Sequence, residues 1–249
     1  MSDQVEVVEE AKQARPLMPK IGYTQILVVA LVICAYFLGV YSTKLNAFQN
    51  GTTVQGAQAQ ALPSPTPGVV NVGVGSYPMR GNKNAKVTVV EFGDLRCPYC
   101  EQFYQNVESQ MVKDYVDTGK IKFYFRNYAF LGPASDVAAN AAACANAQGK
   151  FWQMENYLYE HQPPETDTTM YTVDNLTQVA GNLGMDTGQF NTCLSANKYN
   201  SIVTTDLADG QKAGVSGTPT IFIDGIPVVG AQPYSVFKTL IDQELAKKS

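Results

Sequence analysis

Two cysteines stand two residues apart where an expected strand passes into an expected helix. Residues 87–92 (VTVVEF) form a β-branched run of strand length, and the sequence DLRCPYC follows it. The next segment carries apolar side chains at i, i+4 and i+8, the spacing of one helical face: Phe103, Val107 and Met111. A strand that turns directly into an amphipathic helix indicates a mixed α/β domain.

The chemistry of the chain is expected at Cys97 and Cys100. Two thiols at this spacing on the first turn of a helix can close a small disulfide ring with little change in the backbone. Unpaired backbone N–H groups and the positive end of the helix dipole favour the thiolate of Cys97, the nucleophilic form. Pro98 suits the first helical turn because its missing N–H is no loss there. The motif therefore indicates a redox-active pair.

Two other uses of Cys97 and Cys100 remain open from the motif alone: half of a structural zinc site, or a plain structural disulfide. A zinc site is disfavoured because no second Cys-x-x-Cys or Cys-x-x-His is present. The single histidine, His161, falls in an expected helix and is interpreted as a helix-end residue. We expect no resident metal and no cofactor.

The rest of the folded part alternates in the same way. A second strand is expected at 121–128 after Gly119, and a mainly helical block at about 135–213, with Ser135 as the N-cap of its first helix. The sequence TIFIDGIPVVG predicts a hairpin with Asp-Gly at the turn. A closing helix follows, with one apolar face: Phe237, Leu240, Ile241 and Leu245. Proline at a strand entry in SGTPT suggests a special turn there.

A long uncharged stretch precedes the folded part, at residues 21–43. It is apolar on all sides and covers roughly 34 Å at about 1.5 Å per residue, enough to cross a hydrocarbon core of about 30 Å. Lys and Arg are concentrated before it and only Lys44 follows closely, so residues 1–20 are expected to be cytoplasmic. The small-residue run at 57–61 lies too far away for signal-peptide cleavage. We expect an uncleaved single-pass anchor, with Cys34 as an apolar filler.

Residues 44–69 are rich in Gln, Ala, Thr, Gly and Pro and are expected to form a flexible linker. It would hold an extracytoplasmic domain, residues 70–249, close to the cell membrane. The net charge of -4 and the absence of a basic cluster in the folded part argue against a nucleic-acid binder. The expected partners are proteins or small molecules.

Three motifs in the folded part, EFGDLRCPYC, AAACANAQGKFW and GVSGTPTIFIDG, together resemble the DsbA-like thioredoxin-fold family of exported disulfide oxidoreductases. The resemblance covers about residues 75 to 247. It implies a four- or five-stranded thioredoxin sheet with a helical insertion between the second and third core strands. By position it makes Cys97 the attacking cysteine, Cys100 the resolving one and Pro219 a cis-proline, with Thr218 facing the thiols.

The resemblance also implies a role for an acidic side chain. Glu91 matches the acidic residue beneath the family's active site, where a buried carboxylate with a raised pKa could relay the proton of Cys100. Asp94 is the alternative carboxylate. On the residues alone, Glu91 could equally be a strand-end side chain exposed to water.

Tyr99 departs from the best-known members of that family, which carry histidine in a C-P-H-C motif. A tyrosine cannot supply the positive charge that helps stabilise the thiolate, so we expect a weaker oxidant. C-P-Y-C is also the motif of glutaredoxins, which are milder oxidants. A glutaredoxin would not need a membrane anchor or the helical insertion.

Cys144 and Cys193 both lie in the expected helical insertion of an exported domain, where spare thiols tend to pair. A structural disulfide between them is expected, and two buried free cysteines are the alternative.

The function that follows is a membrane-anchored thiol–disulfide oxidoreductase acting on exported cysteine-containing proteins, as an oxidase. Family resemblance suggests a quinone-linked membrane protein as its redox partner. The other class that stays open is a membrane-tethered binding module, either a metal-delivery protein or a chaperone, in which the cysteines are not catalytic.

Overall fold

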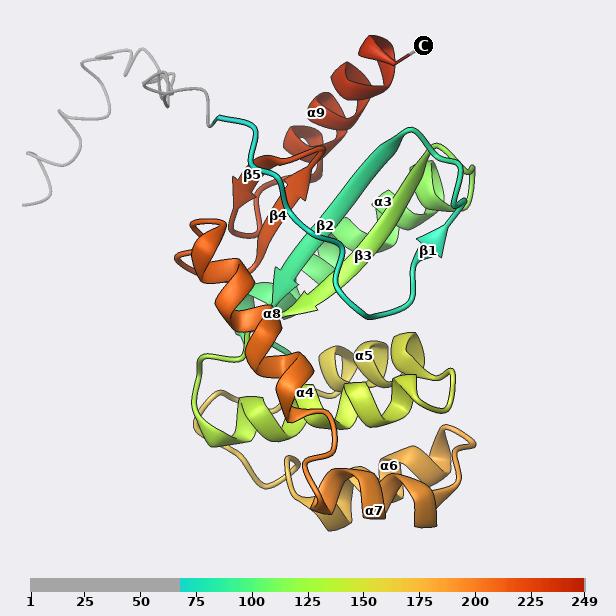
Figure 1. Ribbon diagram of the computed structural model, residues 1–249, viewed down its shortest axis with the longest axis vertical. Coiled ribbons are helices and arrows are strands. Elements are labelled where there is room, and N and C mark those ends of the chain that lie inside the picture. The colour runs from blue at the N-terminus through green and yellow to red at the C-terminus, as the bar shows by residue number, and fades with distance from the viewer. Residues whose placement is uncertain (1–67, 249) are drawn as a thin grey trace, which may run out of the picture. The chain divides into compact units, whose positions relative to one another are not determined.

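The computed structural model describes residues 68–248, which are built around a five-stranded mixed sheet (Figure 1). No helix within this range is long and apolar enough to cross a membrane. The expected tail and anchor, and the expected linker up to residue 67, fall outside the described residues. In chain order the strands are β1 (Arg80–Gly81), β2 (Val87–Gly93), β3 (Ile121–Asn127), β4 (Thr220–Ile223) and β5 (Ile226–Val229).

The strands lie in the order β1-β3-β2-β4-β5, so the first long strand of the chain is at the centre. β2 runs parallel to β3, and the other pairings are antiparallel. β2 is rich in β-branched residues and is buried on both faces, as a central strand covered by helices must be. Val89 packs in a cluster on one face and Val90 in a cluster on the other. The strands expected at 87–92 and 121–128 are confirmed.

The hairpin of β4 and β5 is confirmed as well. Its two turn residues, Asp224 and Gly225, have φ angles of 46° and 86°. Positive φ at both central positions is the geometry of the type I′ turn, whose twist matches that of the flanking strands. The two-residue strand β1 was not predicted, because a strand this short leaves no alternating pattern in the sequence.

One face of the sheet is covered by the helical run that starts at the cysteine motif and by the C-terminal helix α9 (Tyr234–Lys247). The run comprises α2 (Pro98–Phe103), η1 (Tyr104–Glu108), α3 (Ser109–Met111) and η2 (Val112–Val116), in which the η segments are π-helical turns. The predicted apolar face is confirmed, because Phe103, Val107 and Met111 are all buried. The two π-helical turns were not predicted. The Phe103 ring packs edge-on against Phe237 of α9, with ring centroids 5.3 Å apart.

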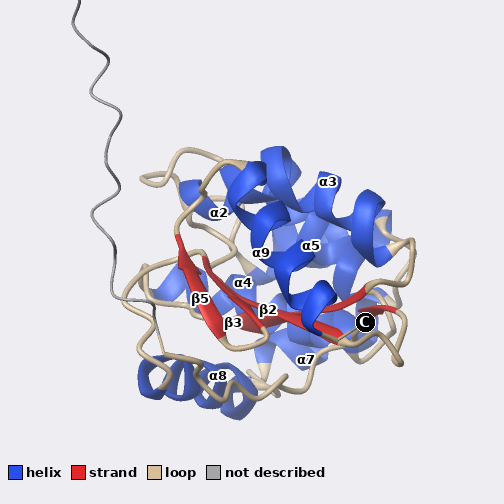
Figure 2. Ribbon diagram, turned by 90° about the horizontal axis from the view of Figure 1, so that it is seen from above, coloured by secondary structure: helices blue, strands red, loops and turns tan. Residues whose placement is uncertain are grey.

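The opposite face is covered by α8 (Asn200–Lys212), and Figure 2 shows α8 and α9 on the two sides of the sheet. Arg126 of β3 forms a buried ion pair with Asp206 of α8, with Nε and Oδ1 2.6 Å apart. Gly210 allows the close approach of this helix, because a Cβ there would lie 2.7 Å from the Tyr128 ring. α8 is therefore fixed to the sheet by charge and by a small residue at the contact.

The helical insertion lies between β3 and β4, as expected, and contains five helices: α4 (Pro133–Asn146), α5 (Phe151–Glu160), α6 (Val173–Asn182), α7 (Thr187–Ser195) and α8. The predicted N-cap, Ser135, is wrong. The helix begins earlier, because Gly132 with φ of 97° turns the chain and Pro133 starts the first helical turn. Ser135 is buried inside that turn.

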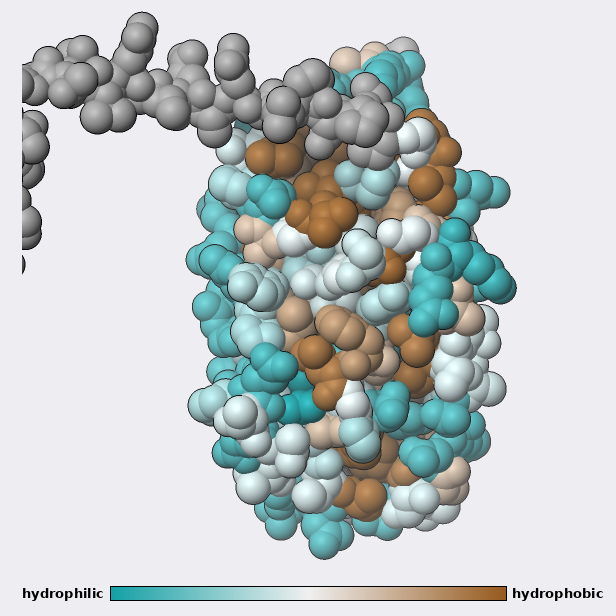
Figure 3. Space-filling view, turned by 90° about the vertical axis from the view of Figure 1, so that its left-hand side faces the viewer, coloured by the Kyte–Doolittle hydropathy of each residue, from teal (hydrophilic) through white to brown (hydrophobic). Residues whose placement is uncertain are grey.

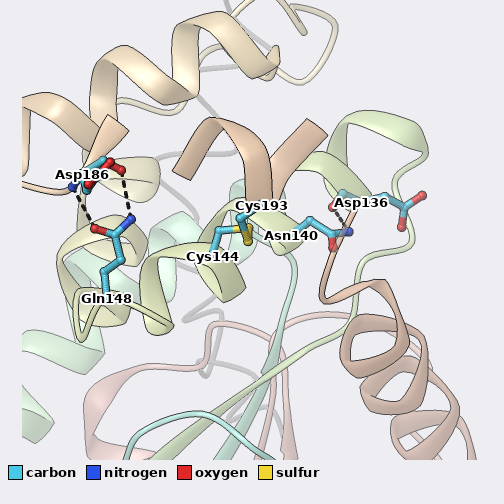
Figure 4. Close-up of a disulfide and its surroundings, with 6 residues drawn as sticks. All are labelled: Asp136, Asn140, Cys144, Gln148, Asp186 and Cys193. Carbon is cyan, nitrogen blue, oxygen red and sulfur yellow. Dashed lines mark hydrogen bonds between the residues drawn. A yellow bond between two sulfur atoms is a disulfide. The ribbon is translucent and has the colours of Figure 1, made fainter. Parts of the chain in front are cut away.

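A disulfide joins α4 to α7 within the insertion. The sulfur atoms of Cys144 and Cys193 are bonded (Figure 4), the pairing expected from the sequence. Beside it, Gln148 and Asp186 exchange two hydrogen bonds, since the Gln148 amide donates to the Asp186 carbonyl and accepts from the Asp186 N–H. The disulfide therefore ties the last turn of α4 to the last turn of α7, and the two hydrogen bonds tie Gln148, just after α4, to the N-cap of α7.

The surface of the domain mixes apolar and hydrophilic side chains. On the face shown in Figure 3, apolar residues lie in several groups separated by hydrophilic ones. The most exposed large apolar side chains of the described residues are Val69, Val74, Tyr99, Phe130, Val229 and Val236. Tyr99 is the one that belongs to the cysteine motif, so this motif reaches the surface through its tyrosine.

Candidate active site

The cysteine motif is held in place by the turn between β2 and α2. Asp94 organises this turn, because its Oδ1 accepts a hydrogen bond from the Arg96 N–H at 2.9 Å. Its Oδ2 accepts from the backbone N–H groups of Phe130 and Leu131 at 3.0 and 3.2 Å. The Cys97 N–H donates to the Asp94 carbonyl at 3.0 Å. The carboxylate of Asp94 is thus fully used in fixing the backbone.

Cys97 is the N-cap of α2 and Pro98 its first residue. The Cys97 carbonyl accepts from the N–H groups of Cys100 and Glu101 at 3.0 and 3.1 Å, which starts the helix. Both cysteines are buried free thiols, whereas the Tyr99 side chain between them is 63% exposed. The motif places its thiols inside and its tyrosine outside.

The loop before β4 closes over Cys97. The Thr218–Pro219 peptide bond is cis, as expected from the resemblance. The Cys97 sulfur lies 3.5 Å from the Thr218 carbonyl oxygen, to which the thiol donates when it is protonated, and the two residues are 121 positions apart in the chain. The loop is held by the Gly230 N–H, which donates to the Pro219 carbonyl at 2.7 Å. The fold therefore brings the cysteine motif and the proline loop together, as the sequence predicted.

The two thiols have opposite acidities. The pKa of Cys97 is lowered to about 6, chiefly because the Cys100 thiol donates a hydrogen bond to the Cys97 sulfur. The Thr218 side chain and backbone N–H groups lower this pKa further, whereas burial opposes the shift. The Thr218 hydroxyl has no hydrogen-bond partner among residues 68–248, so it acts on Cys97 as a nearby dipole. Burial raises the pKa of Cys100 well above its usual range. Cys97 is therefore the thiolate and Cys100 the protonated thiol.

Glu91 lies in the interior beneath this pair. It is fully buried, so the alternative of an exposed strand-end residue is wrong. Neither carboxyl oxygen has a hydrogen-bond partner among the described residues. Burial, and then the nearby Glu108 carboxyl, raise the pKa of Glu91 well above its usual range. The carboxyl oxygens of Glu91 thus have no partner in this part of the chain, whereas both oxygens of Asp94 accept hydrogen bonds.

Comparisons with known proteins agree with this geometry. A family model described as thioredoxin matches residues 74–243. Disulfide bond formation protein D of Bacillus subtilis (strain 168) is 32% identical over 176 residues, which cover 69% of this chain and 78% of that protein. The chain belongs to the DsbA-like thioredoxin-fold family of disulfide oxidoreductases.

Solved structures of the family show the same fold. The crystal structure of oxidised BdbD from Bacillus subtilis is 30% identical, with a TM-score of 0.66, and the match covers 71% of this chain and 98% of that one. The α-DsbA1 protein of Wolbachia pipientis is 21% identical, with a TM-score of 0.63, and covers 71% and 94% of the two chains. The thioredoxin fold with a helical insertion, expected from the sequence, is thus confirmed.

Four side chains of this DsbA-like site were not singled out in the sequence: the partly exposed Arg80 and the buried Glu108, Glu155 and Tyr159. The Arg80 guanidinium lies 2.8 Å from a Glu108 carboxyl oxygen and 3.8 Å from one of Glu155. It also lies over the Trp152 ring, 4.1 Å from the ring centroid. These residues come from three separate elements, so no local pattern marked them.

His161 lies at the end of a helix, as interpreted from the sequence. His161 is the C-cap of α5 and stacks on the Tyr157 ring, with ring centroids 4.0 Å apart. Within residues 68–248, no three His, Cys, Asp or Glu side chains form a group that could hold a metal ion.

Proposed function

We propose that this thiol–disulfide oxidoreductase works as an oxidase, which passes the Cys97–Cys100 disulfide to exported proteins that contain cysteines. The observation that carries the proposal is the opposite acidity of two adjacent thiols. A Cys97 pKa of about 6 stabilises the reduced enzyme as a thiolate at neutral pH. The better the reduced form is stabilised, the more readily the disulfide form accepts electrons.

The exchange proceeds in two displacements. A substrate thiolate attacks the Cys97 sulfur of the oxidised enzyme, the Cys97–Cys100 bond breaks, and its electron pair leaves on Cys100, which takes up a proton. A second substrate thiolate then attacks the substrate sulfur of the mixed disulfide, and Cys97 leaves as a thiolate. The substrate loses two electrons and two protons. The enzyme gains two electrons and one proton, and the other proton goes to solvent.

Each residue of the site has a part in this cycle. Cys97 is the attacked and leaving sulfur, because its low pKa makes it a good leaving group. Cys100 resolves the mixed disulfide when the cycle runs in reverse. Thr218 and Pro219 hold the loop against Cys97. Glu91 supplies the proton that Cys100 takes up, which its burial and raised pKa support.

The domain is placed outside the cytoplasmic membrane in this proposal. Residues 21–43 anchor it as an uncleaved single span, residues 1–20 stay in the cytoplasm, and residues 44–69 tether it. A membrane protein accepts the two electrons of the reduced enzyme and restores the disulfide. The uncharged run at 21–43 and the excess of Lys and Arg before it support this arrangement.

An oxidation assay tests the proposal. The full-length chain, purified in detergent with Cys97–Cys100 oxidised, is mixed with a reduced and unfolded protein whose activity needs its disulfides. We expect recovery of that activity in proportion to the oxidised enzyme added, and none with Cys97→Ser. No recovery, together with zinc bound to the purified chain, would favour the metal-delivery module instead.

A further inference from the structure

The interior next to the active site contains more carboxyl groups than its positive charge can balance. Glu91, Glu108 and Glu155 are each at most 1% exposed. Among residues 68–248, the one cation that forms ion pairs within this group is Arg80, which contacts Glu108 and Glu155 and whose side chain is 21% exposed. Three buried carboxylates against one guanidinium would leave two uncompensated charges in a medium of low dielectric, which is very costly. At least one of the three carboxyl groups therefore stays protonated at neutral pH.

The sheet register places these groups on one face. Arg80 of β1 pairs with Phe123 of β3, and Phe123 pairs with Val89 of β2, so their side chains share a face. Glu91 lies two residues beyond Val89 on the same strand and therefore points to that face as well. Glu108 of η1 and Glu155 of α5 reach Arg80 from helices. The cluster spans the space between the sheet and these two helical segments.

The Glu91 carboxyl is directed toward the active-site end of β2. A Cβ on Gly93 would lie 2.7 Å from the Phe125 ring and 2.9 Å from the Glu91 Oε1, so the ring and this carboxyl together occupy the space that a side chain at Gly93 would need. Gly93 is the last residue of β2, and the turn to Cys97 follows it. The absence of a side chain at Gly93 leaves room for an acid between the strand and the cysteine motif.

The oxygens of this cluster are left free to exchange protons. Both oxygens of Glu91 and of Glu155, one oxygen of Glu108 and the Tyr159 hydroxyl have no hydrogen-bond partner among residues 68–248. The titratable and charged side chains facing the cluster are Arg80 (β1), Glu91 (β2), Cys97 (the N-cap of α2), Cys100 (α2), Tyr104 and Glu108 (η1), and Glu155 and Tyr159 (α5). They form one continuous electrostatic unit with the redox pair.

We propose that Glu91, Glu108 and Glu155 share protons as a single cluster, which supplies the proton taken up by Cys100 and exchanges protons with solvent beside Arg80. The inference deepens the proposed function, on which it rests, by giving the route of the proton at the same site. When the disulfide opens, Glu91 gives its proton to the Cys100 sulfur, and the negative charge left on Glu91 is neutralised by a proton from Glu108 or Glu155. The partly exposed end of the cluster, at Arg80, admits the replacement proton. Burial raises the pKa of Glu108 to about 7, which lets this step run at neutral pH.

Glu108 and Glu155 do not touch the thiols. They affect Cys100 only through Glu91, to which they return a proton.

The test is the infrared difference spectrum between the oxidised full-length chain in detergent and the same chain reduced by dithiothreitol. In the wild type, the carbonyl stretch of the protonated carboxyl groups should shift in frequency on reduction, because Cys97 becomes a thiolate next to the cluster after the cluster has regained its proton. This shift should disappear as the pH rises above the range in which the cluster holds its proton. A wild-type spectrum without any protonated-carboxyl change would overturn the proposal, and this measurement needs no variant.

Two variants sharpen the test. Glu155→Gln removes a buried carboxyl of the cluster, whereas Asp174→Asn changes an exposed carboxyl on α6, away from the cluster. With two carboxyls left, the cluster retains fewer protons, so the rate of disulfide opening by dithiothreitol thiolate should fall about tenfold or more in Glu155→Gln above neutral pH and recover at lower pH. Asp174→Asn should follow the wild type. Superimposable pH profiles for a folded Glu155→Gln variant and the wild type would contradict the proposal.

These measurements separate the inference from the proposed function. Dithiothreitol opens the disulfide whether or not the chain oxidises proteins, so a failed oxidation assay with an intact cluster signal would remove the oxidase proposal alone. A working oxidation assay with no cluster signal would remove only the proton-sharing inference.

Discussion

Cys97 carries the chemical reactivity of the site, and its environment makes a direct prediction. Its pKa is lowered from 9.0 to about 6, chiefly by the Cys100 thiol, whereas burial keeps Cys100 protonated. The ultraviolet absorbance of the thiolate, measured on the reduced chain with the oxidised chain as reference, should rise in one step centred at about pH 6. A step at the pKa of an ordinary cysteine would show that the site does not stabilise the thiolate.

The same pKa links redox state to stability. Because the folded pKa of Cys97 lies below that of the unfolded chain, the reduced protein gains stability as the pH rises above about 6, and the gain is complete above the unfolded pKa. The gain is lost as the pH falls through about 6. The difference in unfolding free energy between reduced and oxidised protein should therefore shift toward the reduced form in urea titrations between about pH 6 and about pH 8, below the range in which the raised pKa of Cys100 acts in the opposite sense.

Tyr99 is expected to make the protein a weaker oxidant, because tyrosine carries no positive charge that could stabilise the Cys97 thiolate. The side chain is exposed and neutral, and the groups that lower the Cys97 pKa are the Cys100 thiol, Thr218 and backbone N–H groups. We expect a reduction potential of roughly -150 to -230 mV. Tyr99→His should raise it by about 30 mV or more, since about 1.4 kcal/mol of added thiolate stabilisation corresponds to that shift.

Glutathione equilibrium titration measures this potential, and Tyr99→Phe serves as the neutral control that should leave it unchanged. A wild-type potential at or above about -120 mV, or the same value for the histidine variant, would show that another group controls the thiolate.

At the level of secondary-structure elements, the disulfide between α4 and α7 links two helices of the insertion. Replacing Cys144 and Cys193 by alanine together should lower the free energy of unfolding by up to about 4 kcal/mol, the chain-entropy value for a loop of this length. Urea unfolding with the active-site pair oxidised measures the difference. Alkylation of the unreduced, unfolded wild type should label Cys34 alone, and labelling of Cys144 and Cys193 would contradict the pairing.

Elements with strong local signals could be predicted from the sequence. The β-branched run of β2, the Asp-Gly turn of the hairpin and the proline at the entry to β4 each carry their own physical cause in neighbouring residues. The meeting of Cys97 with Thr218 followed from the family resemblance, since no local pattern links residues 121 positions apart. The cysteine motif could therefore be predicted from neighbouring residues, whereas the loop that faces it could be predicted only from the family resemblance.

The rest of the site depends on tertiary contacts that leave no local trace. Glu108 belongs to a segment whose sequence has the pattern of an amphipathic helix. Its burial depends on Arg80, which pairs with Glu108 and Glu155 and comes from another element. The start of α4 was misplaced because Ser135 is a good N-cap by composition, whereas Gly132 and Pro133 provide a better turn. Which charged side chains are buried, and which of two possible residues caps a helix, depends on tertiary packing rather than on the helix propensity of single residues.

At the scale of the whole molecule, the uncharged run at 21–43 and the charges on either side of it make a prediction about topology. Residues 21–43 should cross the membrane with residues 70–249 outside the cytoplasm, because Lys and Arg are concentrated on the N-terminal side. Protease added to intact spheroplasts should digest the domain while a cytoplasmic marker protein stays whole. A fully protected domain would reverse the orientation.

The trapping of mixed disulfides tests the central claim that Cys97 and Cys100 exchange disulfides with proteins. The full-length Cys100→Ala and Cys97→Ala variants are expressed in cells, thiols are quenched with acid and alkylated, and complexes are separated without reductant. Cys100→Ala should accumulate long-lived covalent complexes that reductant dissolves, because the buried resolving thiol is gone and Cys97 stays linked to its partner. Cys97→Ala should accumulate none. Equal trapping by the two variants, or no complexes with either, would contradict the assignment.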